Sequence, residues 1–205
     1  HTPDAVQKVF DSVGGRAVKK FEGEPVKGRI ITVTGGAGRR DETTRAERGE
    51  ICAKNSDIFI VTEDDSRDES PAEIAEMFVV GAEKAGMKRG ENLLIELDRK
   101  KAIEQAIAMA RKDDLVLILG KGHEKTILRA DGPHQFEDLK VVRKSLKKIK
   151  SWNKLGNVKI LPIYLVLRFF RFVISDTFGD DVGIDIEGGG DSGGSGHIRN
   201  SSFAW

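Results

Sequence analysis

The sequence predicts an α/β fold: a Rossmann-like, mainly parallel sheet flanked by helices, followed by an irregular C-terminal tail. Up to about residue 150, short apolar runs alternate with amphipathic stretches, and glycine-rich or charged segments directly follow several of the apolar runs. The hydrophobic content of 39% and the charged content of 33% suit a soluble globular chain with a buried core. We therefore expect one domain over residues 1–150 and an unassigned, partly disordered tail over residues 151–205.

Each expected element has a local reason. Thr2 and Pro3 are helix start signals, and the Gly14–Gly15 pair ends that first helix. Ser70 and Pro71 open a capping box for a later helix. Compact aliphatic runs indicate buried strands over residues 29–34, 57–62, 93–97 and 115–119. Apolar periodicity indicates further helices over residues 44–54, 99–111 and 136–149. Such alternation predicts right-handed crossovers and a ligand site in the loops after the strands.

Composition excludes several classes of protein. The 34 basic residues against 33 acidic ones give a net charge of +1, which does not fit a strongly basic nucleic-acid binder. The single Cys52 excludes an internal disulfide framework and a thiolate zinc cluster, and it fits a reducing, cytoplasmic setting. The four histidines lack ligand spacing, so we expect no metal site. The apolar run over residues 158–175 is too short and too charged for a membrane span.

The loop after the first long strand contains Gly35–Gly38 and then Arg40. Glycines let backbone N–H groups approach an anion, and Arg40 could pair with a phosphate or a carboxylate. The alternative is a plain glycine-rich turn with solvated arginines. We favour this alternative for the loop taken alone, because the full G-x-G-x-x-G spacing is missing and the chain contains no G-x-x-x-x-G-K-[ST] loop.

Two further loops are chemically suggestive. Residues 63–69 place five acids around Arg67, which would suit a ligand that carries both an ammonium and a carboxylate. The alternative is a solvated acidic loop before a helix, which is favoured when the loop is taken alone. Gly120–Glu124 follows the most apolar strand and contains His123, a candidate titrating group. A turn whose histidine only bonds to the backbone is an equally good interpretation.

Taken together and in this order, the loops resemble the C-terminal domain of the Mur ligases. Within that family, they are most similar to the members that add the third residue of the peptidoglycan stem peptide. The resemblance covers residues 1–148. It is carried by residues 1–5 (HTPDA), by Gly38–Asp41 with Arg45 and Gly49, by Asp64–Arg67 (D-N/D-P-R), by Asp98–Arg99 with Ala102 and Ile103, by Gly120–Glu124 (GKGHE) and by Phe136–Asp138 (F-x-D).

Two stretches depart from the family pattern. Thr44-Arg45-Ala46 replaces Lys-Arg-Pro, and Ser66 replaces the proline of D-N-P-R. A proline fixes φ, so Ser66 is expected to loosen the loop. Asp65 stands in place of the more usual asparagine, which changes the charge of the pocket and leaves the identity of the bound amino acid open.

The resemblance implies an ATP-dependent ligase of cell-wall synthesis. Its substrate carboxylate, on a UDP-N-acetylmuramoyl dipeptide, becomes an acyl phosphate that an amino-acid amine attacks, with magnesium neutralising the phosphates. Arg67 would take a carboxylate of the amino acid, and Asp64 and Glu124 would take ammonium groups. The whole amino-acid site implied by the resemblance is Arg40, Asp64, Asp65, Arg67, Gly120 and Glu124.

Further expectations follow from the same resemblance. His1 and Asp4 would lie near the nucleotide, and no catalytic residue is assigned in this chain. Arg67 favours diaminopimelate over lysine as the added amino acid. ATP and magnesium would be bound mainly by a central ligase domain, and the remaining ligase domains would be partners of this chain.

Three hypotheses about function stay open. The first is a piece of a ligase that neither hydrolyses ATP nor joins amino acids by itself. The second is a non-catalytic binding or regulatory domain derived from a Mur ligase, and a phosphate loop in the upstream coding sequence would decide against it. The third, a dinucleotide-binding oxidoreductase, lacks its full glycine fingerprint. We also expect that removing residues 152–205 leaves the thermal transition nearly unchanged.

Overall fold

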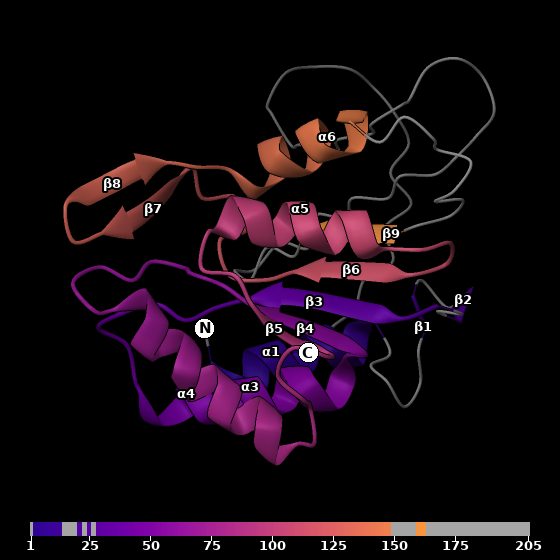
Figure 1. The fold of residues 1–205 in the computed structure, drawn as a ribbon, viewed down its shortest axis with the longest axis horizontal. Coiled ribbons are helices and arrows are strands. Elements are labelled where there is room, and N and C mark those ends of the chain that lie inside the picture. The colour runs from indigo at the N-terminus through magenta and orange to yellow at the C-terminus, as the bar shows by residue number, and fades with distance from the viewer. Residues whose placement is uncertain (1, 14–19, 22–23, 26–27, 149–158, 163–205) are drawn as a thin grey trace, which may run out of the picture.

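The computed structural model describes residues 2–13, 20–21, 24–25, 28–148 and 159–162. Its centre is a five-stranded parallel sheet in the order β5-β4-β3-β6-β9, with helices on both faces (Figure 1). The strands of the sheet are β3 (Ile30–Thr34), β4 (Ile58–Val61), β5 (Leu93–Ile95), β6 (Leu115–Ile118) and β9 (Lys159–Pro162). The helices are α1 (Pro3–Ser12), α3 (Thr43–Asn55), α4 (Pro71–Lys84), α5 (Arg99–Met109) and α6 (Asp138–Lys148). The predicted fold class is confirmed.

The strand order places a switch in chain direction at the middle of the sheet. From β3 the chain moves outward through β4 to β5, and α5 then carries it back to β6 on the other side of β3. Helices α1, α3 and α4 cover one face, whereas α5 and α6 cover the opposite face (Figure 1). In such open sheets, ligands bind beyond the strand carboxyl ends at this switch point. The loops after β3, β4 and β6 meet there.

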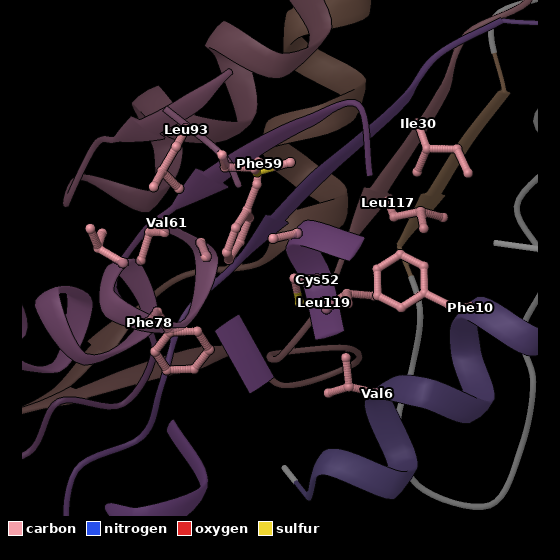
Figure 2. Close-up of a cluster of buried hydrophobic side chains, with 14 of the residues drawn as sticks. Val6, Phe10, Ile30, Cys52, Phe59, Val61, Phe78, Leu93, Leu117 and Leu119 are labelled. Atoms are coloured by element: carbon pink, nitrogen blue, oxygen red, sulfur yellow. The ribbon is translucent and has the colours of Figure 1, made fainter. Parts of the chain in front are cut away.

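The two hydrophobic clusters follow the pleat of the strands. Successive strand residues point to opposite faces, so Ile30 packs with the α1, α3 and α4 layer, whereas Ile31 packs with α5 and α6. Figure 2 shows the first cluster, in which Phe10, Phe59 and Phe78 belong to α1, β4 and α4. All three phenylalanine side chains have 0% relative exposure. Apolar burial on both faces therefore fixes the sheet rigidly beneath the loops.

Two short hairpins were not anticipated from the sequence. They are β1 (Lys20–Phe21) with β2 (Glu24–Pro25), and β7 (Thr126–Arg129) with β8 (Gly132–Gln135). The second hairpin lies beyond the end of the sheet toward which β3 points (Figure 1). A partial signal for it was present in the sequence, because the two-residue loop Ala130–Asp131 is followed by Gly132, which has a positive φ of +115°.

An irregular tail was expected after residue 150, but the four residues of it that the structure describes form a strand. Residues 159–162 form β9, which pairs in parallel with β6 from Leu115↔Lys159 to Ile118↔Pro162. The expectation is therefore wrong for these four residues. A proline is tolerated at the end of an edge strand, so Pro162 did not exclude the pairing. The rest of residues 151–205 lies outside the described part, and no helix in the described part is long and apolar enough to cross a membrane.

Candidate functional site

The glycines of the loop after β3 make room for the neighbouring loop after β4. A Cβ atom at Gly35 would lie 1.9 Å from the carbonyl oxygen of Thr62, and one at Gly38 would lie 2.0 Å from that of Ser66. The N–H of Gly38 already donates to the carbonyl of Asp65 at 2.7 Å. The structure thus supports the interpretation of this loop as a packing turn rather than an anion cradle.

Two buried arginines of α3 hold this glycine loop from below. Arg45 donates to the carbonyl of Ala37 at 3.3 Å, and Arg48 donates to the carbonyl of Gly35 at 2.9 Å. Burial lowers the pKa of Arg48, whose guanidinium also lies 4.8 Å from the ring centroid of Phe78. Because both arginines bond to backbone oxygens, they fix the path of the chain at the carboxyl end of β3.

The loop after β4 is held on two sides. On one side, the guanidinium of Arg67 donates to the carbonyl of Gly38. On the other side, the N–H of Arg67 donates to the carbonyl of Leu128 in β7 at 2.9 Å, and the N–H of Leu128 donates to Asp65 Oδ1 at 2.8 Å. Arg67 is half-buried and has a left-handed φ of +54°, which is uncommon for a residue with a side chain. The β7–β8 hairpin therefore sets the orientation of Arg67.

A buried ammonium joins the loops after β4 and β6. Lys121 Nζ lies 2.6 Å from Asp65 Oδ1, 2.5 Å from Glu124 Oε2 and 3.8 Å from Asp64 Oδ1. Lys121 is 1% exposed, whereas the side chain of Glu124 is 43% exposed. Burial opposes the charged form, yet the hydrogen bonds to Asp65 and Glu124 raise the pKa of Lys121 above its ordinary value. The ammonium therefore stays charged, and it binds the two loops together.

A second buried ion pair ties the ends of β4 and β6. Arg99, with 0% exposure, forms two bonds to Asp138, of 2.8 Å from Nε and 2.7 Å from Nη2. The same guanidinium donates to the carbonyl of Glu63 at 3.3 Å and to that of Leu119 at 2.9 Å. The Asp98–Arg99 and Phe136–Asp138 elements of the sequence thus meet beneath the site.

The structure brings together four of the residues that the sequence assigned to the amino-acid site. Asp64, Asp65 and Glu124 surround Lys121, and a Cβ atom at Gly120 would lie 2.5 Å from Asp64 Oδ2. Arg67 lies in the loop after β4, two positions beyond Asp65. The side chain of Arg40 is exposed on the loop after β3 and has no recorded bond within the described residues.

The remaining assignments are less central. Asp4 is exposed in the first turn of α1, and His1 lies outside the described residues. His123 is exposed at the tip of its turn, which leaves both interpretations of it open. Where the structure describes the chain, no group of three or more histidine, cysteine, aspartate or glutamate residues could hold a metal ion.

Sequence reasoning missed three residues that organise the site. Lys121 lies inside the GKGHE stretch, but the sequence alone predicted no function for its side chain. Arg99 and Asp138 were predicted only as members of family motifs, without a structural function. For Lys121, the signal was a lysine between two glycines directly after a strand. That signal did not reveal its partners, because Asp65 lies 56 positions away in the chain.

A parallel sheet with charged, paired loops at the carboxyl ends of its central strands defines an α/β ligand-binding domain. The sequence profile described as "Mur ligase, glutamate ligase domain" matches residues 1–122. The chain belongs to the Mur ligase family, whose members are ATP-dependent.

Individual relatives agree with this assignment. The chain is 38% identical over 149 residues to UDP-N-acetylmuramoyl-L-alanyl-D-glutamate--2,6-diaminopimelate ligase 1 of Clostridium acetobutylicum, with 73% of this chain and 28% of the relative covered. It is 39% identical over 146 residues to the corresponding ligase of Aquifex aeolicus, with 71% and 27% covered. A solved structure of such a ligase matches with a TM-score of 0.58 and 28% identity, covering 72% of this chain and 28% of that one. The chain thus spans just over a quarter of the length of these relatives.

Proposed function

We propose that this chain is the amino-acid-binding domain of an ATP-dependent ligase that adds the third residue to a UDP-N-acetylmuramoyl dipeptide. In the proposed reaction, ATP phosphorylates the dipeptide carboxylate, and the amine of the amino acid attacks the acyl phosphate. The amide bond forms, inorganic phosphate leaves and the amine gives up its proton. The names of the relatives, which specify diaminopimelate, support this substrate class.

One observation carries the proposal: a guanidinium and a set of carboxylates lie in adjoining loops at the switch point of the sheet. Arg67 can bind a carboxylate through two parallel hydrogen bonds. Asp64 and Glu124 can accept hydrogen bonds from ammonium groups. This combination matches diaminopimelate, which carries a carboxylate and an amine at both ends, better than it matches lysine.

ATP and magnesium have no evident site among the described residues. The backbone of the neighbouring loop lies where Cβ atoms at Gly35 and Gly38 would be, and the N–H of Gly38 is already bonded. We therefore propose that residues of the ligase other than those described bind the nucleotide and the metal. We also propose that the ligase works in the cytoplasm, which would supply its ATP.

Calorimetric titration of the 205-residue chain with meso-diaminopimelate and with L-lysine tests the proposal. We expect diaminopimelate to bind at least about tenfold more tightly than lysine, because only diaminopimelate offers a distal carboxylate to Arg67. Glycine is the control, since it has neither the second amine nor the second carboxylate. A folded chain that binds diaminopimelate no better than glycine would contradict the proposed site.

A chimera decides between a ligase domain and a non-catalytic binding domain. Residues 1–162, which include β9, would replace the matching C-terminal segment of the Clostridium acetobutylicum relative. Formation of the amide product, measured by mass spectrometry, supports the ligase proposal. Diaminopimelate binding without product, in a chimera that is folded and still binds ATP, favours the non-catalytic domain.

A further inference from the structure

The buried ammonium of Lys121 has no role in the function proposed above. It is almost completely enclosed at the junction of the loops after β4 and β6, with 1% exposure. It lies where the sequence analysis placed an ammonium group of the substrate, between carboxylates of those two loops. Either it competes with the substrate amine, or it arranges the carboxylates that receive that amine.

The geometry favours arrangement over competition. Lys121 engages Oε2 of Glu124, and Oε1 has no recorded partner among the described residues. With its side chain 43% exposed, Glu124 can be reached by a ligand while Lys121 stays in place. A carboxylate has two oxygens and about four acceptor positions, so it can hold both ammonium groups at once.

The turn itself is built around this contact. Gly122 has a φ of +56°, and the N–H of Glu124 donates to the carbonyl of Lys121 at 3.0 Å. The chain therefore folds back within three residues, which brings the Glu124 carboxylate to the Lys121 ammonium. Without Lys121, a half-exposed glutamate on a short turn would sample several rotamers.

Asp65 anchors the other side of Lys121. Its Oδ1 accepts hydrogen bonds from Lys121 Nζ at 2.6 Å and from the N–H of Leu128 at 2.8 Å. Asp65 is 8% exposed, so its charge needs a partner inside the protein. The aspartate that replaces the usual asparagine of the motif is thus paired with Lys121, and Asp65–Lys121–Glu124 forms a continuous bridge.

We propose that Lys121 is a positioning residue that holds the Glu124 carboxylate in place for an ammonium group of the bound amino acid. This inference rests on the proposed function, because it assigns the contact through which Lys121 acts on that same site. Lys121 itself touches the carboxylates and not the substrate.

Three variants of the 205-residue chain test it: Lys121→Met, Asp65→Asn and the double variant. Lys121→Met removes the ammonium and leaves Asp65 charged and buried, so we expect lower stability against urea and about ten- to hundredfold weaker binding of diaminopimelate. Adding Asp65→Asn removes that uncompensated charge, so stability should recover. Affinity should stay about tenfold or more below that of Asp65→Asn alone, because Glu124 is still not held.

A purely structural role gives a different pattern, in which affinity recovers together with stability in the double variant. That result would overturn the inference, and so would unchanged or tighter binding by Lys121→Met, since tighter binding identifies Lys121 as a competitor. If Lys121→Met does not fold, the affinity of the double variant for diaminopimelate, compared with that of Asp65→Asn, decides between the two roles of Lys121.

Side-chain NMR separates failure of this inference from failure of the proposed function. If the wild-type chain binds neither diaminopimelate nor lysine, the proposed function fails. The 13C relaxation of the Glu124 side chain then decides the positioning role. Greater mobility of Glu124 in the double variant than in Asp65→Asn supports the role of Lys121, whereas equal mobility overturns it.

Discussion

Three cationic side chains of the described residues are at most 1% exposed, and each one bonds to groups from separate segments of the chain. Arg45, Arg99 and Lys121 have relative exposures of 1%, 0% and 1%. A buried charge is tolerated only when it is paired and hydrogen-bonded. In each case the partners include loop carbonyls or carboxylates near the carboxyl ends of β3, β4 and β6. At the scale of single residues, buried charge therefore fixes the loops of the proposed site.

Arg67→Lys should weaken the binding of diaminopimelate by the chain about ten- to hundredfold, because lysine cannot reproduce a bidentate guanidinium–carboxylate pair. That loss corresponds to about 1.5–3 kcal/mol, as for a charge-assisted hydrogen bond. Binding of L-lysine, which has no distal carboxylate, should change much less. Calorimetry on both chains measures the four dissociation constants, with the melting temperature as a check on folding. Equal affinities of the two chains for diaminopimelate would leave Arg67 only its contact with the carbonyl of Gly38.

Gly120→Ala should destabilise the domain more than the matched substitution Gly132→Ala. Both glycines have a positive φ, of +112° and +115°, so each alanine costs about 1–2 kcal/mol in backbone strain. At Gly120 the new Cβ would also lie 2.5 Å from Asp64 Oδ2, whereas at Gly132 nothing lies within 4 Å. The collision should add about 1–3 kcal/mol. Urea unfolding of both variants measures the difference, and equal losses would show that Asp64 moves away at no cost.

At the scale of elements, α3 and α4 approach each other through two glycines. A Cβ atom at Gly49 would lie 2.1 Å from the carbonyl oxygen of Phe78, and one at Gly81 would lie 1.8 Å from that of Ala46. These atoms belong to helix backbones, which cannot turn aside as a flexible side chain can. The close crossing carries Arg45 and Arg48 on α3 under the glycine loop, so helix packing and loop position are coupled.

Gly81→Ala should therefore destabilise the protein, although alanine is the better helix former. Intrinsic propensity favours alanine by about 0.8–1.0 kcal/mol in a helix interior. Forcing two helices apart costs about 1–3 kcal/mol, and here the contact is with rigid backbone, so we expect a net loss. Val80→Ala is the control on the same helix, since Val80 is 59% exposed and should change stability by less than about 0.5 kcal/mol. A higher melting temperature for Gly81→Ala than for wild type would contradict this packing argument.

The elements that the sequence predicted best are those whose pattern is local. The β-branched run that forms β3 and the Ser70 cap of α4, whose side chain accepts from the N–H of Glu73, are determined by neighbouring residues. β9 was missed because it pairs with β6, a distant segment. The β7–β8 hairpin had a local turn signal, but its contacts with the loop after β4 could not be anticipated from neighbouring residues.

The same distinction applies to the candidate site. The sequence indicated which loops contain its residues, since ligand loops follow parallel strands. It did not indicate that Lys121 would occupy the space between Asp65 and Glu124. It also did not indicate that the backbone of Thr62 and Ser66 would lie against Gly35 and Gly38. Both facts depend on how two loops meet in space. The roles of the site residues in binding remain predictions.

For the whole molecule, the sheet order explains why residues far apart in sequence act at one place. β4 and β6 are the two neighbours of β3, so the loops that follow them converge over its carboxyl end. The layer of α1, α3 and α4 and the layer of α5 and α6 each contribute a buried arginine beneath this point, Arg45 from α3 and Arg99 from α5. The site therefore depends on both hydrophobic clusters, so a substitution that disturbs the packing of either helix layer should also shift the loops of the site.

The pairing of β9 changes the expected result of shortening the chain. A chain that ends at Lys150 loses β9, which leaves the backbone of β6 from Leu115 to Ile118 without its partner on that side. β6 then becomes an edge strand of the described sheet, although its residues Leu115–Ile118 have 0% exposure in the full chain. We now expect the melting temperature to fall by about 5 °C or more, in place of the unchanged transition predicted from the sequence. A chain that ends after Pro162 keeps β9 and is the matched control. Scanning calorimetry of the two shortened chains and the full chain measures the effect. If the chain ending at Lys150 melts with the full chain, then the domain is complete at residue 150 and β9 contributes nothing to its stability.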